Sequence, residues 1–276
     1  MQRLIWSDFD QNSPYSQMGI GAKQTNGPGY WSTIRQVFEH DLETLPLNRF
    51  RHWASCHNVP LITRYQTWQF LGAGFEAARQ FSAYHEALKE NWIGVIPGHE
   101  SDLRLSSDFD TSMQRVQDVA HLHLCDFTPY DFEKYNTIVE IGGGYGDMCS
   151  VIHNSGFKGK YTIYDFPEIN KIQEYYLTQQ GINANLISDP SLLEPADLVI
   201  ATWSLSEIPI EEREPIMSRI IDSKDWLVMY QDRIFGTVSN TTYFKDLFGH
   251  HPKFMNLNHT AYDGENTYMV VINANI

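Results

Sequence analysis

Residues 137–147 constrain the fold of this chain more than any other stretch. They read TIVEIGGGYGD, a β-branched apolar run that contains Glu140 and ends in closely spaced glycines. Met148, Val151 and Ile152 follow at helical spacing. The pattern predicts a strand, a tight glycine turn and a helix start, a combination in which backbone can approach a ligand and N–H groups are free.

The spacing of the glycines separates two nucleotide-binding patterns. The dinucleotide fingerprint G-x-G-x-x-G would need a further glycine at position 147 or 149, where Asp147 and Cys149 stand. The pattern that fits is E-x-G-x-G-x-G, and its residues are Glu140, Gly142, Gly144 and Gly146, with Gly143 inside it. A tight turn without a ligand is the alternative interpretation.

A second carboxylate follows about twenty residues later. Residues 161–165, YTIYD, form a short β-type run that ends in Asp165. In a doubly wound sheet this end lies at the ligand-binding edge, where a carboxylate can accept hydrogen bonds from both ribose hydroxyls. We therefore predict Asp165 as a ribose ligand. The alternative is a helix cap ahead of Pro167.

From residue 137 onward, strand and helix patterns alternate, which predicts a parallel sheet with helices on both faces. Helices are expected at 147–155 and 167–180 and from Pro209 onward. Further strands are expected at 183–188, 198–203 and 226–230. Two last strands, at 253–258 and 267–273, flank a turn that contains Asp263 and Gly264, which predicts a hairpin.

These motifs together resemble class I S-adenosylmethionine (SAM) dependent methyltransferases. The stretches 139–146, 164–168, 173–177 and 204–207 are similar to those of bacterial sugar O-methyltransferases, as are Tyr230-Gln231, Asn240 with Tyr243-Phe244, and His259. The resemblance covers roughly the C-terminal half. It implies an α/β fold: a Rossmann-like class I methyltransferase sheet with a C-terminal β-hairpin, preceded by a mainly helical N-terminal region.

The resemblance implies SAM as the cofactor and a hydroxyl of a sugar or glycoside as the methyl acceptor. The predicted cofactor-binding residues are the acidic and glycine residues of the turn, Asp165, and residues at or just past other strand ends. In chain order they are Glu140, Gly142, Gly143, Gly144, Gly146, Asp165, Phe166, Asp189, Thr202 and Trp203.

A neutral sugar hydroxyl has a high pKa, so methyl transfer to it needs a general base or a metal. The candidate bases are His259, Glu207 and Asp232, which follow predicted strands. We rank His259 first because the pKa of histidine suits a base near neutral pH. Alternatively, Glu207 caps the helix at Pro209, Asp232 pairs with Arg233 or another cation, and His259 is a turn residue. Glu207 and Asp232 could hold a divalent metal, but their spacing gives little support for a metal site.

The N-terminal half has a different sequence pattern from the C-terminal half. Residues 1–29 are rich in Gln, Asn, Gly, Ser and Pro, which predicts a flexible arm or lid. Residues 30–130 are predicted to form a helical substrate region, with an amphipathic stretch at 75–88 and a helix that starts at the Asp110 or Thr111 cap. Residues 131–276 are then the SAM-binding domain.

The composition narrows the classes of partner. The formal net charge is −14, which argues against a nucleic-acid substrate. The three cysteines, Cys56, Cys125 and Cys149, lack metal-binding spacing and predict reduced core residues. No apolar run suits a membrane span or a signal peptide, so we expect a cytoplasmic protein. The sequence does not decide whether the chain forms a homodimer.

Two alternative functions are considered. One is an NAD-dependent oxidoreductase or epimerase, and the other is a SAM-binding partner subunit without catalysis.

Overall fold

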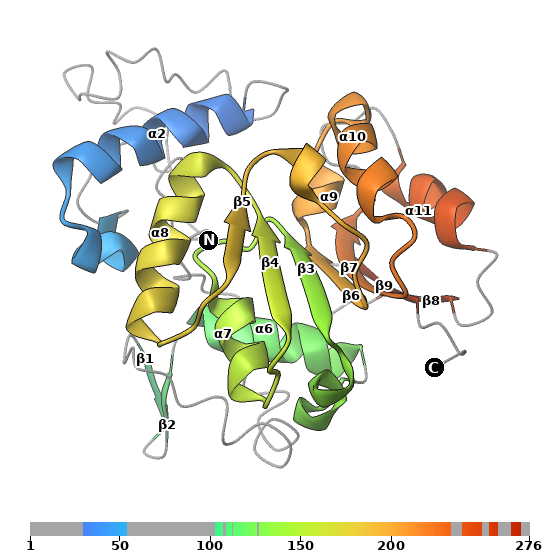
Figure 1. Ribbon diagram of the computed structural model, residues 1–276, viewed down its shortest axis with the longest axis horizontal. Coiled ribbons are helices and arrows are strands. Elements are labelled where there is room, and N and C mark those ends of the chain that lie inside the picture. Colours follow the sequence, from blue (N-terminus) through green and yellow to red (C-terminus); the bar gives the residue numbers. More distant parts are fainter. Residues whose placement is uncertain are drawn as a thin grey trace, which may run out of the picture. The chain divides into compact units, whose positions relative to one another are not determined.

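The computed structural model describes residues 30–53, 103–106, 109–111, 113–125, 127–232, 239–249, 254–258 and 266–271 (Figure 1). The chain divides into two compact units, Met1–Ala73 and Gly74–Ile276. In the first unit, helix α2 (Tyr30–Thr44) is followed by the short 3-10 helix η2 (Leu47–His52). The Trp53 indole N–H donates to the Pro46 carbonyl over 3.2 Å and closes this turn.

The second unit is built on a seven-stranded sheet with the order β5-β4-β3-β6-β7-β9-β8. The first five strands in this order are parallel, and the last two pairings are antiparallel. This is the predicted layout, including the C-terminal hairpin. The strands are β3 (Thr137–Ile141), β4 (Lys160–Tyr164), β5 (Asn185–Ile187), β6 (Leu198–Thr202), β7 (Asp225–Gln231), β8 (Phe254–Asn258) and β9 (Asn266–Val271).

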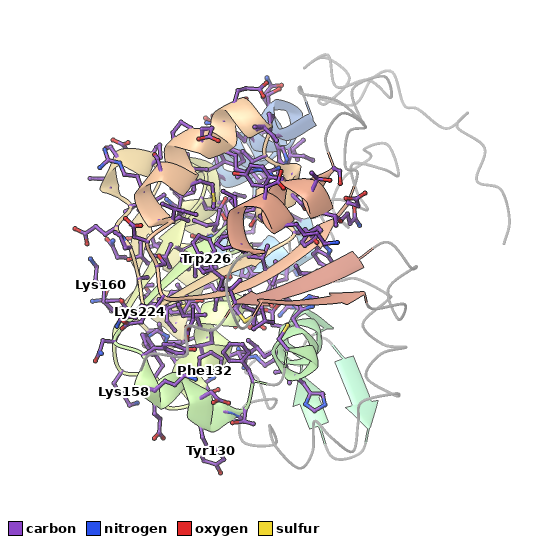
Figure 2. All side chains as sticks on the ribbon, turned by 90° about the vertical axis from the view of Figure 1, so that its right-hand side faces the viewer. Tyr130, Phe132, Lys158, Lys160, Lys224 and Trp226 are labelled. Atoms are coloured by element: carbon purple, nitrogen blue, oxygen red, sulfur yellow. The ribbon has the colours of Figure 1, made fainter. Side chains whose placement is uncertain are left out.

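Helices cover both faces of the sheet. On one face, α10 and α11 pack their apolar side chains against alternate residues of the strands, and Trp226 of β7 contacts Phe248 of α11 with ring centroids 4.9 Å apart. Figure 2 shows Trp226 on the side of α10 and α11, and Phe132 on the opposite side with α6. The helices are α6 (Met113–Leu124), α7 (Asp147–Asn154), α8 (Pro167–Gln179), α9 (Ser204–Glu207), α10 (Ile210–Ile220) and α11 (Asn240–Phe248).

The strands are buried because each contributes apolar residues to both faces. In β6 all residues from Leu198 to Ala201 are buried, as expected for a strand of a parallel sheet that is covered on both sides. Strand β3 is central, and its two neighbours, β4 and β6, connect in opposite directions along the sheet. This reversal is the position at which open α/β sheets bind their ligands, beyond the carboxyl ends of the strands.

One part of the predicted helical region is wrong. Strands β1 (Leu103–Ser106) and β2 (Phe109–Thr111) pair antiparallel, and α6 begins only at Met113. Asp110 and Thr111 therefore lie in a strand and not at the start of the predicted helix. Their backbone groups find partners in the neighbouring strand, a pairing that the helical periodicity downstream does not reveal.

The remaining differences are small. Strand β5 begins at Asn185, two residues after its predicted start. Cys125 and Cys149 are buried free thiols, as predicted.

Helix α6 belongs to the same unit as the sheet, whereas the functional division at residue 130 stays a prediction. The predicted arm at 1–29 and the amphipathic stretch at 75–88 lie outside the described residues, as does Cys56. No described helix is long and apolar enough to cross a membrane.

Candidate functional site

The glycine turn links β3 to α7 and is tied to both neighbouring strands. The Gly142 N–H donates to the Tyr164 carbonyl at the end of β4 over 2.9 Å. On the other side, the Ser204 hydroxyl, just past β6, donates to the Ile141 carbonyl. The Gly146 N–H closes the turn on the Gly143 carbonyl over 2.9 Å. The turn is thus fixed at the carboxyl edge between β4 and β6.

Packing within the protein itself opposes a side chain at three of the glycines. A Cβ at Gly142 would overlap the Ser204 Cβ, and one at Gly143 would lie 2.8 Å from a methyl group of Ile163. A Cβ at Gly146 would lie 3.2 Å from Leu177 Cγ. Gly142, Gly144 and Gly146 also have positive φ, which disfavours other residues. Packing within the fold thus opposes a Cβ at Gly142, Gly143 and Gly146, and the approach of a ligand to the turn stays a prediction.

Asp165 lies just past β4 and is oriented by the glycine turn. Its carboxylate accepts hydrogen bonds from the Phe166 N–H over 2.8 Å and from the Gln173 side-chain amide over 2.9 Å. Burial raises the pKa of Asp165 to about 7, although these bonds and one from the Gly143 N–H favour its charged form. Gln173 also donates to the Gly144 carbonyl over 2.9 Å. Asp165, Gln173 and the turn therefore form one connected group.

The alternative role of Asp165 as a helix cap is not seen. The residue that precedes α8 is Phe166, with Pro167 at the first helical position, and α8 has no side-chain cap. A capping carboxylate would accept from an N–H of the second or third helical residue. The carboxylate of Asp165 instead faces the glycine turn through Gly143 and Gln173.

Glu140 supports the turn from within the sheet. Its side chain is buried and accepts a hydrogen bond from the Tyr161 hydroxyl over 2.9 Å. Burial raises the pKa of Glu140 to about 8. A Cβ at Gly143 would lie 3.1 Å from its Oε2 atom, so this carboxyl lies directly beneath the turn. Its predicted contact with a cofactor stays a prediction.

Sequence reasoning missed a buried cation beneath α7. Arg115 of α6 donates to the Asp147 carboxylate and to the Ser150 hydroxyl, each over 2.8 Å, and to the Tyr176 hydroxyl over 3.0 Å. The Tyr176 hydroxyl in turn donates to Asp147 over 2.6 Å. The network joins α6, α7 and α8 at the start of α7. No local pattern could have revealed it, because Arg115 and Asp147 are 32 residues apart.

The other predicted cofactor residues also follow strand ends. Phe166 lies after β4, and Asp189 lies after β5, where its carboxylate accepts from the Ser191 N–H over 2.8 Å. Thr202 is the last residue of β6 and is paired with Met229 of β7. All three therefore lie at the edge that holds the glycine turn, and their contacts with a cofactor stay predictions.

Trp203 has a strained backbone at this edge. Its φ is 67°, and it is the one non-glycine residue with positive φ among those that the structure describes. Its N–H donates to the Met229 carbonyl over 2.7 Å, which fixes the residue against β7. Its ring meets the edge of the His121 ring with centroids 5.3 Å apart. Burial lowers the pKa of His121 to about 3, so this histidine is neutral. Such strain persists where the surrounding structure imposes it, often at functional sites.

Glu207 ends the one-turn helix α9 beyond β6. Among the described residues, its carboxyl has no hydrogen-bond or ion-pair partner, and burial alone raises its pKa to about 8. It does not cap α10, whose first flanking residue is Pro209 and which has no side-chain cap. An unpaired carboxyl with a raised pKa is suited to accept a proton near neutral pH.

Asp232, the second candidate carboxylate, is used in hydrogen bonds within the protein. It accepts hydrogen bonds from the Ser239 hydroxyl over 2.8 Å and from the Thr241 N–H over 2.9 Å, and so stabilises the start of α11. His259 and Arg233 lie outside the described residues. Of the two candidate bases that the structure describes, the geometry favours Glu207, and the role of His259 stays a prediction. Among the residues that the structure describes, no group of three or more His, Cys, Asp or Glu side chains could hold a metal ion.

Comparison with known proteins found solved structures that are similar to this chain. No family model and no curated protein matches the chain. The mitomycin 7-O-methyltransferase MmcR is 14% identical over 95% of this chain and 73% of its own, with a TM-score of 0.44. The N-methyltransferase NodS from Bradyrhizobium japonicum WM9, in complex with S-adenosyl-l-homocysteine, is 12% identical over 58% of this chain and 86% of its own, with a TM-score of 0.44. At these values the likenesses add nothing to the functional argument.

A pair of glycine substitutions tests the packing of the turn. Gly142→Ala should lower the free energy of unfolding by about 2–5 kcal/mol, because positive φ and the overlap with Ser204 both oppose a Cβ. Gly181 has a φ of +68° but nothing within 4 Å of its Cβ position. Gly181→Ala should therefore cost only about 1–2 kcal/mol. Urea denaturation measures both, and equal losses would contradict the contact with Ser204.

Three carboxyls with raised pKa values predict an unusual dependence of stability on pH. The pKa values of Glu140, Asp165 and Glu207 are raised to about 8, 7 and 8. Between pH 6.5 and 8 the folded chain therefore binds more protons than the unfolded chain, and the free energy of unfolding falls as the pH rises. We expect a melting temperature about 2–6 °C lower at pH 8 than at pH 6.5.

The control for this experiment is Glu207→Gln, which should reduce the difference between the two pH values. The histidines with lowered pKa, His121 and His153, act with the opposite sign, and most of their effect falls below pH 7 because histidines of the unfolded chain titrate near 6.5. A melting temperature that rises from pH 6.5 to 8 would show that these carboxyls are ionised in the folded chain.

Proposed function

We propose that this chain is a SAM-dependent O-methyltransferase that transfers a methyl group to a hydroxyl of a sugar or glycoside. The observation that supports the proposal most directly is the grouping at one sheet edge. The glycine turn after β3 lies between Asp165, just past β4, and Glu207, just past β6. One carboxyl is held by the turn, and the other has no partner among the described residues.

The residues at the turn fit a cofactor such as SAM. The Asp165 carboxylate is in place to accept hydrogen bonds from a ribose diol. The Gln173 side chain is fully buried, and its Oε1 atom has no hydrogen-bond partner among the residues described, which leaves an acceptor beside Asp165. Carboxyl groups gather at the turn, because Glu140 lies close enough to Asp165 and Asp147 to feel their charge, whereas Arg115 is paired with Asp147. A cationic ligand is therefore favoured over an anionic one.

SAM, when bound, supplies an electrophilic methyl group on a positively charged sulfur. The protein then has to align the acceptor oxygen and remove its proton. Glu207 can accept this proton in its ionised form, and its raised pKa makes it a stronger base than an exposed glutamate. Trp203 lies four residues before Glu207 and has a strained backbone. It places an aromatic ring at the same edge of the sheet.

The sugar hydroxyl is the part of the proposal that rests on the sequence resemblance. A neutral hydroxyl with a high pKa needs a base, and Glu207 is a candidate for that role. The net charge of −14 disfavours a nucleic-acid acceptor. Together these arguments favour a small neutral acceptor such as a sugar or glycoside.

Cofactor binding is tested by Asp165→Ala. The wild-type chain should bind SAM in calorimetry and should not bind NAD. The variant should lose about 2–4 kcal/mol of SAM affinity, because two hydrogen bonds to a carboxylate are removed. The control is Asp222→Ala, an exposed acid at the opposite edge of the sheet, which should leave SAM affinity unchanged. Tight NAD binding by the wild-type chain would instead support an oxidoreductase.

The catalytic role of Glu207 is tested by Glu207→Gln. Incubation with SAM and a panel of methyl glycosides and nucleotide sugars, followed by mass spectrometry, identifies an acceptor. On that acceptor the variant should be about 10²- to 10⁴-fold slower, with SAM affinity nearly intact. Wild-type activity should rise with pH up to about 8, where Glu207 ionises. Full activity of the variant would transfer the role to His259.

A further inference from the structure

The short helix that bears Glu207 has too few residues to stabilise itself by hydrogen bonds within the helix. Helix α9 has four residues, Ser204–Glu207, and is followed by Ile208 in extended conformation. A single helical turn leaves its last carbonyl groups without partners inside the helix. The carbonyls on both sides of Glu207, those of Ser206 and Ile208, are instead bound by side chains from two other helices.

The first of these side chains belongs to Asn240, at the start of α11. Its amide donates to the Ser206 carbonyl over 3.3 Å and to the Gln231 carbonyl, at the end of β7, over 2.8 Å. Its backbone N–H donates to the Asp232 carbonyl over 2.8 Å. Asn240 is buried. One side chain thus joins the turn that holds Glu207 to the end of β7.

The second is Arg213 of α10. Its guanidinium donates to the Ile208 carbonyl over 2.8 Å and to the Asn240 side-chain oxygen over 3.0 Å. It lies against the rings of Tyr243 and Phe244, at 4.6 and 5.7 Å from their centroids. The side chain is buried, and no carboxylate among the described residues forms an ion pair with it. Burial of an unpaired cation is costly, so its hydrogen bonds and ring contacts have to offset that cost.

We propose that Arg213 and Asn240 are positioning residues, which together hold the Glu207 carboxyl at the sheet edge. The inference rests on the proposed function of Glu207 as the base. The two side chains bind each other and the two carbonyls that flank Glu207, so a shift of either one would release the turn. The other end of α9 is already fixed by the contacts of Trp203 with Met229 and of Ser204 with Ile141.

Asn240→Asp separates positioning from stability. The aspartate keeps an oxygen for Arg213 and forms an ion pair with it, so the fold should be retained. It loses the amide donor, so the Ser206 and Gln231 carbonyls are released. With carboxyl-¹³C-labelled glutamate, and with Glu207→Gln to assign the signal, the pKa of Glu207 should fall from about 8 towards the ordinary range near 4–5 as water enters.

Three further readouts complete the test. The amides of residues 205–208 should exchange with deuterium at least about tenfold faster in Asn240→Asp. Turnover on the acceptor identified above should fall by about tenfold or more, with SAM affinity within about twofold of wild type. Arg213→Lys, which keeps the charge but loses the two-pronged geometry, should change the same readouts in the same direction.

The matched control is Tyr135→Phe, which removes a buried hydrogen bond of 2.8 Å to Asp225 at the opposite edge of the sheet. It should lower the melting temperature without changing the pKa of Glu207 or the exchange at residues 205–208. Unchanged pKa and exchange in Asn240→Asp would overturn the positioning role. Absence of SAM binding in the wild-type chain would reject the proposed function but leave the pKa and exchange results intact, so the two failures are distinct.

Discussion

The attachment of the glycine turn to its two neighbouring strands is the constraint on which the rest of the site depends. One hydrogen bond, from Gly142 to Tyr164, fixes the turn to the end of β4, and another, from Ser204 to Ile141, fixes it to the loop after β6. These contacts require backbone at Gly142 to lie against Ser204 without a Cβ between them. As a result, Asp165 and Glu207 are held on opposite sides of one turn.

The site also depends on burial of acidic groups. Glu140, Asp165 and Glu207 follow or belong to parallel strands and share raised pKa values, but their surroundings differ. Glu140 accepts from Tyr161 beneath the turn, Asp165 is held by the turn itself, and Glu207 has no partner among the described residues. Carboxyls in such different surroundings can titrate differently, and the proposed function assigns ribose binding to Asp165 and proton transfer to Glu207.

Buried cations join the site to segments that are distant in the chain. Arg115 connects α6 with the start of α7, and Arg213 connects α10 with the turn that holds Glu207. The two differ in their partners, because Arg115 forms an ion pair with Asp147 whereas Arg213 binds a carbonyl, an amide oxygen and aromatic rings. An arginine can bind either a carboxylate or neutral oxygens and rings, because its planar guanidinium has several N–H donors in fixed directions.

The sequence alone determined the order of strands and helices from residue 137 onward, the glycine turn and the C-terminal hairpin, because these depend on local periodicity, β-branched residues and turn chemistry. It also placed Asp165 and Glu207 just past their strands. Only the tertiary structure decided that Thr111 ends a strand and that Asp232 stabilises α11 while Glu207 has no partner among the described residues. It also decided that Arg213 and Asn240 bind the carbonyls on either side of Glu207. These properties arise from burial and from contacts between residues far apart in the chain, and no local pattern encodes them.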